Sequence, residues 1–239
     1  MIETERLSFA YNDGTKALRN ITLRVREGES AGIIGTNGAG KSTLLNHLNG
    51  WFTPQSGTVT VDSIPSTKKS QETLRRKVGL VFQNPDDQLF MTRLYDDIMF
   101  GPDNLGMHRT ESEAEAERLL RNFGLWELRE KPPSKLSQGQ KRFAAFAAVL
   151  VMRPPILVMD EPTSDLDARN RKKLISLIRS LSSTRITVSH DLDFIWDTCD
   201  RVFVMNSGRI SAEGTTTEIL ADRQLLEENG LELPIRLQH

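Results

Sequence analysis

The sequence predicts an α/β fold built on a largely parallel sheet, with all 239 residues in a single domain. Three observations support this fold. A continuous apolar strand runs into a glycine-rich turn, short strands alternate with helical patterns, and the segment from about 84 to 152 has no strong strand. We expect that last segment to form a helical subdomain.

The first elements differ in the burial that their patterns predict. Residues 6–11 (RLSFAY) and 21–26 (ITLRVR) alternate apolar and polar side chains, as half-buried antiparallel strands do. Residues 30–35 (SAGIIG) are continuously apolar, which is typical of a strand buried on both faces. Residues 41–50 (KSTLLNHLNG) follow the glycine-rich turn and are predicted to form a helix.

Strands and helices alternate through the rest of the chain. Short strands are predicted at 58–61, 78–82, 155–160, 185–190 and 201–205. Helical patterns cover 112–123, 139–152 and 168–182. This order favours a parallel sheet, and the tail after residue 222 is short and charged.

Composition excludes several classes of function. Lysine and arginine number 31 against 32 acids, a net charge of -1, so no global field draws the chain to nucleic acid or anionic lipid. One cysteine, Cys199, cannot form an internal disulfide and suits a reducing compartment. The four histidines lack the spacing of metal ligands. The first residues, MIETERLSFAY, do not form a cleavable signal peptide. The longest apolar run, 143–152, is too short to span a bilayer. We therefore expect a soluble cytosolic protein.

Residues 35–43 (GTNGAGKST) match the strand–GxxxxGK[ST]–helix pattern of phosphate-binding loops. Glycines let the backbone turn its N–H groups toward phosphate oxygens, Lys41 supplies a charge for the β and γ phosphates, and Ser42 offers a hydroxyl to Mg²⁺. The predicted nucleotide contacts are Gly35, Thr36, Asn37, Gly38, Ala39, Gly40, Lys41, Ser42 and Thr43. The alternative, a chance glycine turn, is disfavoured because strand, loop and helix are in register. The sequence has no guanine-reading Asn-Lys-x-Asp motif, which disfavours a GTPase.

Two acids end the apolar strand at 155–160. Asp160 lies at the carboxyl end of the strand, where α/β sheets bind ligands, and is predicted to reach Mg²⁺. Glu161 follows it, and because neighbouring strand side chains point to opposite faces, we expect the two acids to have separate roles. Glu161 would then activate a water molecule. The alternative is an acid pair at a helix start.

Three single residues also point to nucleotide chemistry. His190 ends a buried strand at the same predicted sheet edge, where it could bond the γ-phosphate or the attacking water, or be purely structural. Tyr11 ends the first strand, and an adenine could stack on its ring, although packing explains it equally well. Gln83 follows a strand and offers an amide oxygen to the metal, or is a solvated loop residue.

Residues 135–143 (KLSQGQKRF) contain a capping-box pattern, Ser137 followed by Gln140 before an apolar run. A helix that starts there with glycine in its first turn also presents unpaired N–H groups to an anion. The pattern alone does not say whether a phosphate binds there.

Taken in order, these motifs resemble the ATPase subunit of an ATP-binding-cassette (ABC) transporter over nearly the whole chain. The resemblance makes Tyr11 the adenine-stacking aromatic, Gln83 the Q-loop, 164–167 (SDLD) the D-loop and His190 the switch histidine. It implies a P-loop NTPase (RecA-like) core with an N-terminal antiparallel β subdomain and a helical signature subdomain. It also implies ATP and Mg²⁺ as ligands, Ser42, Gln83 and Asp160 at the metal, and Glu161, His190 and Lys41 as catalytic residues.

The resemblance assigns a partner to the segment 136–140 (LSQGQ), which stands where the family has its LSGGQ signature. ABC ATPases form head-to-tail dimers, so Ser137, Gly139 and Gln140 would bind the ATP held by the Lys41 of a second subunit, either an identical copy or a paralogue. Two residues depart from the family pattern. Thr36 replaces a common proline, and Gln138 replaces the first signature glycine, with a free N–H but added bulk near the partner's nucleotide.

Segments 82–90 (FQNPDDQLF), 100–107 (FGPDNLGM) and 225–234 (LLEENGLELP) resemble ATPases of energy-coupling-factor importers, especially the cobalt and nickel group. This implies a peripheral protein on the cytoplasmic face of the cell membrane, with a transmembrane coupling protein docked near 83–90 and a separate substrate-binding membrane component. Nucleic acid is not expected as a partner. The alternatives are an importer of a vitamin or another small solute, an ABC protein of DNA repair or translation, and a regulatory ATP-binding dimerisation module.

Overall fold

The computed structural model describes residues 1–238. The strands are β1 (Ile2–Ala10), β2 (Lys16–Val25), β3 (Ser30–Ile34), β4 (Ser56–Val61), β5 (Ile64–Pro65), β6 (Val78–Val81), β7 (Ile156–Asp160), β8 (Thr184–Val188), β9 (Arg201–Asn206) and β10 (Arg209–Thr215). The α-helices are α1 (Lys41–Leu48), α2 (Gln71–Lys77), α3 (Leu94–Leu105), α4 (Arg109–Phe123), α5 (Gln138–Leu150), α6 (Ala168–Ser180), α7 (Leu192–Thr198), α8 (Thr216–Ala221) and α9 (Arg223–Glu228).

The strands of residues 1–238 form two sheets. The smaller sheet has the order β2-β1-β4-β5, with antiparallel pairing throughout. The larger has the order β10-β9-β3-β8-β7-β6, in which β10 alone runs antiparallel to its neighbour. The α/β fold with an N-terminal antiparallel sheet and a largely parallel second sheet, predicted from the sequence, is confirmed.

Burial in the parallel sheet follows the predicted patterns. Every residue of β3 is buried, which agrees with its continuous apolar run. Along β7, Ile156 and Val158 pack into one hydrophobic cluster, while Leu157 and Met159 pack into another on the opposite face. The sheet is therefore covered on both faces, and its strand ends are the edges open to ligands.

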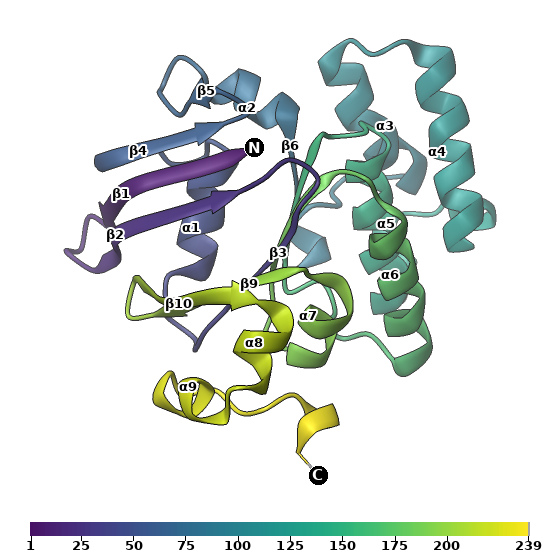
Figure 1. Cartoon of the computed structure of the whole chain (residues 1–239). Coiled ribbons are helices and arrows are strands. Elements are labelled where there is room, and N and C mark those ends of the chain that lie inside the picture. Colours follow the sequence, from purple (N-terminus) through teal and green to yellow (C-terminus); the bar gives the residue numbers. More distant parts are fainter. Residues whose placement is uncertain (239) are drawn as a thin grey trace.

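Helices cover the two faces differently. α1 lies between the two sheets, where Leu44, Leu45 and Leu48 are buried with side chains of both. On the other side, α3, α4 and α5 pack together with α6, and Figure 1 shows this group beside the strands and apart from the antiparallel sheet. The segment 84–152 contains helices and no strand within the described residues, as the sequence predicts.

The C-terminal segment is more ordered than its charged sequence suggests. α8 and α9 pack against α7 and β9, and Leu226 is fully buried there. Near the chain end, Arg236 pairs with Asp193 at 2.6 Å and with Asp197 at 2.9 Å, both on α7. Among residues 1–238, no helix combines the length and apolar character needed to cross a membrane.

Candidate active site

The phosphate loop, residues 35–43, connects β3 to α1 and depends on glycine at two points. Gly40 caps α1 with φ 99°, and a Cβ atom there would lie 2.4 Å from the carbonyl oxygen of Ala17. Gly38 has φ 80° and open space where a Cβ would be. Glycine adopts these left-handed conformations without strain, so the backbone can present N–H groups to an anion at the start of α1.

Lys41 is the first residue of α1, and its ammonium group is held inside the loop. The residue is only 8% exposed, and its Nζ donates to the carbonyl oxygens of Gly35 at 2.8 Å and Thr36 at 3.0 Å. Burial lowers the pKa of Lys41, while the negative charges of Glu161 and Asp160 act in the opposite direction. A partly desolvated cation therefore lies where the loop would receive phosphate oxygens.

A cavity of about 330 Å³ lies beside the loop and brings together residues from distant parts of the sequence. The predicted site residues that line it are Tyr11, Asn37, Gly38, Gly40, Lys41, Ser42, Thr43, Gln83, Asp160 and Glu161. The cavity is also lined by three residues that were not predicted, from the turn before β2 and the start of that strand: Thr15, Lys16 and Ala17. They carry no motif, and only the fold of β1 and β2 places them there.

Six predicted nucleotide contacts are not among the lining residues. Gly35, Thr36 and Ala39 belong to the loop but do not face the cavity, and Ala39 is 2% exposed. Ser137, Gly139 and Gln140 lie at the start of α5, outside this cavity. Their contacts with a nucleotide stay predictions.

The predicted metal ligands do come together. Ser42, Gln83 and Asp160 line the 330 Å³ cavity and also an adjoining one of about 190 Å³. Burial raises the pKa of Asp160, and a hydrogen bond with Ser42 partly offsets that shift. A hydroxyl, an amide and a carboxylate supply the oxygen ligands that Mg²⁺ prefers. No group of three or more histidine, cysteine or acidic side chains suited to a metal occurs within residues 1–238.

The separate roles expected of Asp160 and Glu161 were argued from strand alternation, but Glu161 lies outside the strand. β7 ends at Asp160, and Glu161 has φ 45°, a left-handed conformation outside the strand. Its N–H donates to the carbonyl oxygen of Val188 at 2.8 Å, and both acids line the same cavity. Strand alternation does not apply across this turn, and a non-glycine residue with positive φ is a feature that active sites often retain.

The Glu161 carboxylate, with the residue 8% exposed, is bound through one of its oxygens. Oε2 accepts hydrogen bonds from the backbone N–H of His190 at 3.1 Å, from Ser189 Oγ at 3.2 Å and from His190 Nδ1 at 2.7 Å. Within residues 1–238, Oε1 forms no hydrogen bond. Ser189 was not predicted as a site residue, although it directly precedes His190 at the end of β8.

His190 itself does not line the 330 Å³ cavity. Its ring is 72% exposed and faces a cavity of about 980 Å³, formed with 163–166 and part of the C-terminal segment 231–238. Since an ionised Glu161 only accepts hydrogen bonds, Nδ1 carries the hydrogen of the 2.7 Å contact. The predicted contact of His190 with a phosphate or water stays a prediction.

Tyr11 lies at the edge of the cavity with its hydroxyl group anchored. Its OH shares a hydrogen bond of 2.8 Å with Thr43 Oγ1, and its ring meets Phe9 and Phe52 edge to face. The Thr43 hydroxyl is therefore bound to Tyr11. Packing therefore explains the position of Tyr11. Because the residue is 40% exposed, its ring still has room for a stacked base.

The start of α5 has the predicted capping box. Ser137 Oγ accepts from the backbone N–H of Gln140 at 3.3 Å, and Gln140 Oε1 accepts from the N–H of Ser137 at 2.9 Å. Gln138 is the first helical residue, as expected, and its exposed side chain makes no hydrogen bond within residues 1–238. The capping box occupies both the amide oxygen and the backbone N–H of Gln140, so its side-chain Nε2 is the donor left for a ligand.

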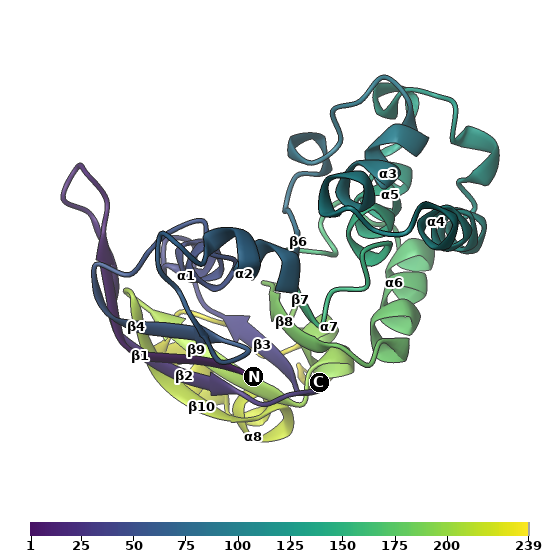
Figure 2. The ribbon, with the colours of Figure 1, turned by 90° about the horizontal axis from the view of Figure 1, so that it is seen from above.

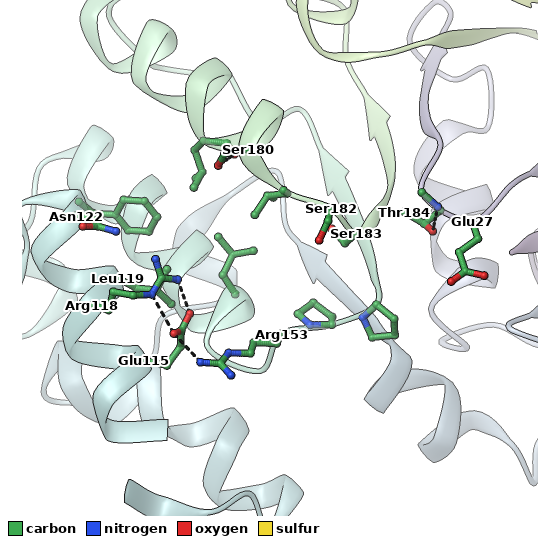
Figure 3. Close-up of a pocket in the computed structure, with 17 residues that line it drawn as sticks. Glu27, Glu115, Arg118, Leu119, Asn122, Arg153, Ser180, Ser182, Ser183 and Thr184 are labelled. Carbon is green, nitrogen blue, oxygen red and sulfur yellow. Dashed lines mark hydrogen bonds and ion pairs between the residues drawn. The ribbon is translucent and has the colours of Figure 1, made fainter. Parts of the chain in front are cut away.

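A larger cavity, of about 740 Å³, lies at the opposite edge of the parallel sheet, where β7 and β8 begin (Figure 3). Figure 3 shows Arg118 and Arg153 directed at Glu115, with ion-pair distances of 2.5 and 2.9 Å. Both guanidinium groups are already paired with a carboxylate, and no phosphate loop contributes to the walls. The smaller cavity is therefore the candidate active site.

Comparisons with known proteins agree with this geometry. Residues 18–164 match the family described as ABC transporter. Over 237 residues the chain is 45% identical to the energy-coupling factor transporter ATP-binding protein EcfA of Carboxydothermus hydrogenoformans. The aligned region covers 98% of this chain and 87% of that protein.

Solved structures show the same likeness. The structure of cbiO1 from Clostridium perfringens, described as part of the ABC transporter complex cbiONQ, matches with TM-score 0.81, 38% identity and coverage of 95% of this chain and 93% of that one. The dimeric ATP-binding cassette MJ0796 in a post-hydrolysis state, bound to ADP and Pi, matches with TM-score 0.83, 27% identity and coverage of 90% and 99%.

Proposed function

The chain belongs to the ABC transporter family, as an ATPase of the energy-coupling-factor type, and on this premise we propose how its site hydrolyses ATP and what the hydrolysis drives. The observation that carries the proposal is the 330 Å³ cavity, which unites the phosphate loop, the three metal-ligand candidates and Glu161. ATP is the substrate, with its phosphates on residues 35–43 and its adenine against Tyr11.

Mg²⁺ fits the oxygen donors of Ser42, Gln83 and Asp160. When bound with ATP, it neutralises charge on the β and γ phosphate oxygens. Lys41 contributes a second positive charge from inside the loop. Without nucleotide, Lys41 Nζ donates to the neutral carbonyl oxygens of Gly35 and Thr36. When phosphate oxygens replace these acceptors, the hydrogen bonds become stronger because the new acceptors are charged.

Glu161 acts as the general base. Ser189 and His190 hold Oε2, and Oε1 is left to accept a proton from a water molecule in the cavity. The water oxygen bonds to the γ-phosphorus as the bond to the bridging oxygen of ADP breaks, which releases inorganic phosphate. His190 positions Glu161 through Nδ1, and its exposed ring is free to contact the γ-phosphate.

A second ATPase subunit completes the site in a head-to-tail arrangement. Ser137, Gly139 and Gln140 are supported in this role because they lie outside the cavity of their own chain, at a capped helix start whose backbone can bind an anion. ATP bound between two subunits contributes to the association, and loss of the γ-phosphate weakens it.

A transmembrane coupling protein docks on the segment 83–90. Three exposed aromatic side chains support this: Phe82 is 37% exposed, Phe90 62% and Phe100 44%, and the last two rings meet at 5.0 Å. Exposed aromatic groups of this kind are typical anchors of protein interfaces. The complex would include a substrate-binding membrane component and hold this chain on the cytoplasmic face of the cell membrane.

The proposed cargo is a cobalt or nickel ion, imported through the membrane partners. The support is the resemblance of segments 82–90, 100–107 and 225–234 to that group of importers. Uptake of labelled Co²⁺ and Ni²⁺ by cells that express this chain with its genomic neighbours tests the cargo. Uptake of a vitamin instead, dependent on the same ATPase, would assign the alternative importer class.

Glu161→Gln tests the catalytic assignment. We expect turnover to fall about 10²- to 10⁴-fold, the usual worth of a positioned general base, while the affinity for ATP is retained. The measurement is steady-state ATPase activity with Mg²⁺, alongside nucleotide binding. The matched control is Glu113→Gln, an exposed glutamate on α4 that pairs with Arg109 and should leave turnover unchanged. Turnover equal to wild type in Glu161→Gln would remove this residue from the role of base.

A further inference from the structure

Arg142 is a buried cation that the mechanism above does not use. It lies near the start of α5, only 2% exposed, and is the bulkiest of the fully buried side chains. Burying a guanidinium group costs free energy unless its donors are satisfied. Its contacts should therefore reveal why the charge is kept there.

Those contacts lead to two segments of the active site. Nη1 donates to the carbonyl oxygen of Phe82 at 2.9 Å, and Nη2 donates to that of Ser164 at 3.3 Å. Nε is buried without a partner, and no ion pair involves Arg142 in the part of the chain described. Burial lowers the pKa of Arg142, opposed by the charges of Asp165 and Glu161. The charge is thus held mainly by two backbone carbonyls.

Phe82 is linked to α5 a second time. Its backbone N–H donates to Gln88 Oε1 at 3.3 Å, and Gln88 Nε2 donates to the carbonyl oxygen of Ala145, on α5, at 2.7 Å. Both backbone groups of Phe82 are therefore bound to side chains that are attached to this helix.

The two carbonyls adjoin catalytic residues. Phe82 directly precedes Gln83, which lines the ATP cavity. Ser164 lies three residues after Glu161, and its N–H donates to the Glu161 carbonyl oxygen at 3.2 Å. The guanidinium of Arg142 thus joins three parts of the chain: the helix that begins at the signature segment, the Q-loop and the turn that carries Glu161.

We propose that Arg142 is a positioning residue that couples the signature segment, when it binds the ATP of the partner subunit, to Gln83 and Glu161 of its own site. The proposal rests on the head-to-tail dimer of the proposed function. A movement of α5 toward the partner's nucleotide would displace both carbonyls together, because the planar guanidinium fork fixes their relative positions. Each ATP site would then respond to the other.

Arg142→Met separates this role from a purely structural one. The apolar side chain avoids the cost of burying a charge, but it leaves the Phe82 and Ser164 carbonyl oxygens without the donor that Arg142 supplies, which lowers stability. We therefore expect the melting temperature to fall by about 4–10 °C with cooperative unfolding retained. With Mg-ATP, we expect kcat to fall at least about tenfold, equal to 1.4 kcal/mol, and the Hill coefficient for ATP to fall to about 1, with binding of ATP to the isolated subunit unchanged.

Hydrogen exchange gives a readout that needs no activity. In Arg142→Met without nucleotide, amides of 82–88 and 163–167 should exchange faster, while those of β3 and α1 should not. Arg142→Lys should restore part of kcat, because its ammonium can reach one carbonyl but lacks the fork that binds both. Arg185→Met is the matched control: Arg185 is half-buried, donates to the Ser183 carbonyl at 3.1 Å, and lies at the start of β8 away from the site.

Normal exchange in 82–88 and 163–167 would overturn the link between α5 and these segments. Faster exchange with an unchanged kcat and Hill coefficient would overturn the coupling role. A wild-type protein that binds ATP but never hydrolyses it would instead contradict the proposed function, and the exchange experiment would still report on the link.

Discussion

Gln138 is the residue at which this chain departs most from the signature of its family. It occupies the first position of α5, its side chain is exposed, and the capping box beside it is formed by Ser137 and Gln140. The cap does not depend on the Gln138 side chain. We therefore expect Gln138 to affect the contact with the partner's nucleotide and not the fold.

Gln138→Gly tests that conclusion. Removing the side chain takes away bulk at the proposed contact, so we expect the ATP concentration that gives half-maximal turnover to fall by about two- to tenfold. The circular dichroism spectrum should be unchanged. Gln224→Gly, at an exposed position of α9, controls for a glycine in a helix. If Gln138→Gly has wild-type ATP dependence, the glutamine points away from the nucleotide.

At the same scale, some residues were predictable and others were not. Lys41 and Ser42 belong to a local motif whose spacing alone defines their chemistry, so the sequence identified them. The left-handed conformation of Glu161 was not predicted, because no residue pattern marks a left-handed glutamate after a strand. Arg142 was missed because a lysine–arginine pair near a helix start suggests a solvated face, and its two carbonyl partners lie 60 and 22 residues away.

At the scale of elements, most candidate site residues lie in the loops that follow parallel strands. The phosphate loop follows β3, Gln83 follows β6 by two residues, Glu161 follows β7 and Ser189 follows β8. Parallel strands bring these ends to one edge of the sheet, which is why the order of strands and helices, together with the motifs at the strand ends, predicted that these residues lie near one another. The paired β10 and the packed helices α7 to α9 were not predicted, since their burial depends on contacts with distant segments.

The docking segment gives the prediction at this scale. Phe90→Ser should reduce copurification with the membrane partner at least about tenfold, because a central aromatic anchor is worth about 2 kcal/mol or more in an interface and 1.4 kcal/mol is tenfold. Nucleotide binding should be unchanged. Trp51→Ser is the matched control, an aromatic side chain 60% exposed in the turn after α1.

Copurification that survives Phe90→Ser together with Phe100→Ser would remove this surface from the docking site. A loss shared equally by Trp51→Ser would indicate general surface effects and would also contradict the assignment.

At the scale of the whole molecule, the proposed function implies that one chain holds two incomplete halves of an active site. The loop, the metal-ligand candidates and Glu161 share one cavity, while the capped start of α5 presents its backbone elsewhere. Figures 1 and 2 show the helical group α3 to α5 set to one side of the two sheets, so the halves belong to different parts of the molecule. Two copies in head-to-tail contact would join complementary halves into two complete sites.

The most direct test of that account is the mass of Glu161→Gln in solution with Mg-ATP, measured by light scattering after size exclusion. We expect a mass of 27.0 kDa without nucleotide and twice that mass with ATP, because binding persists when hydrolysis is blocked. Adding Ser137→Arg to the same variant should keep ATP on the loop but leave the mass at 27.0 kDa. A Glu161→Gln protein that stays at 27.0 kDa with ATP bound, or a double variant that dimerises equally well, would contradict it.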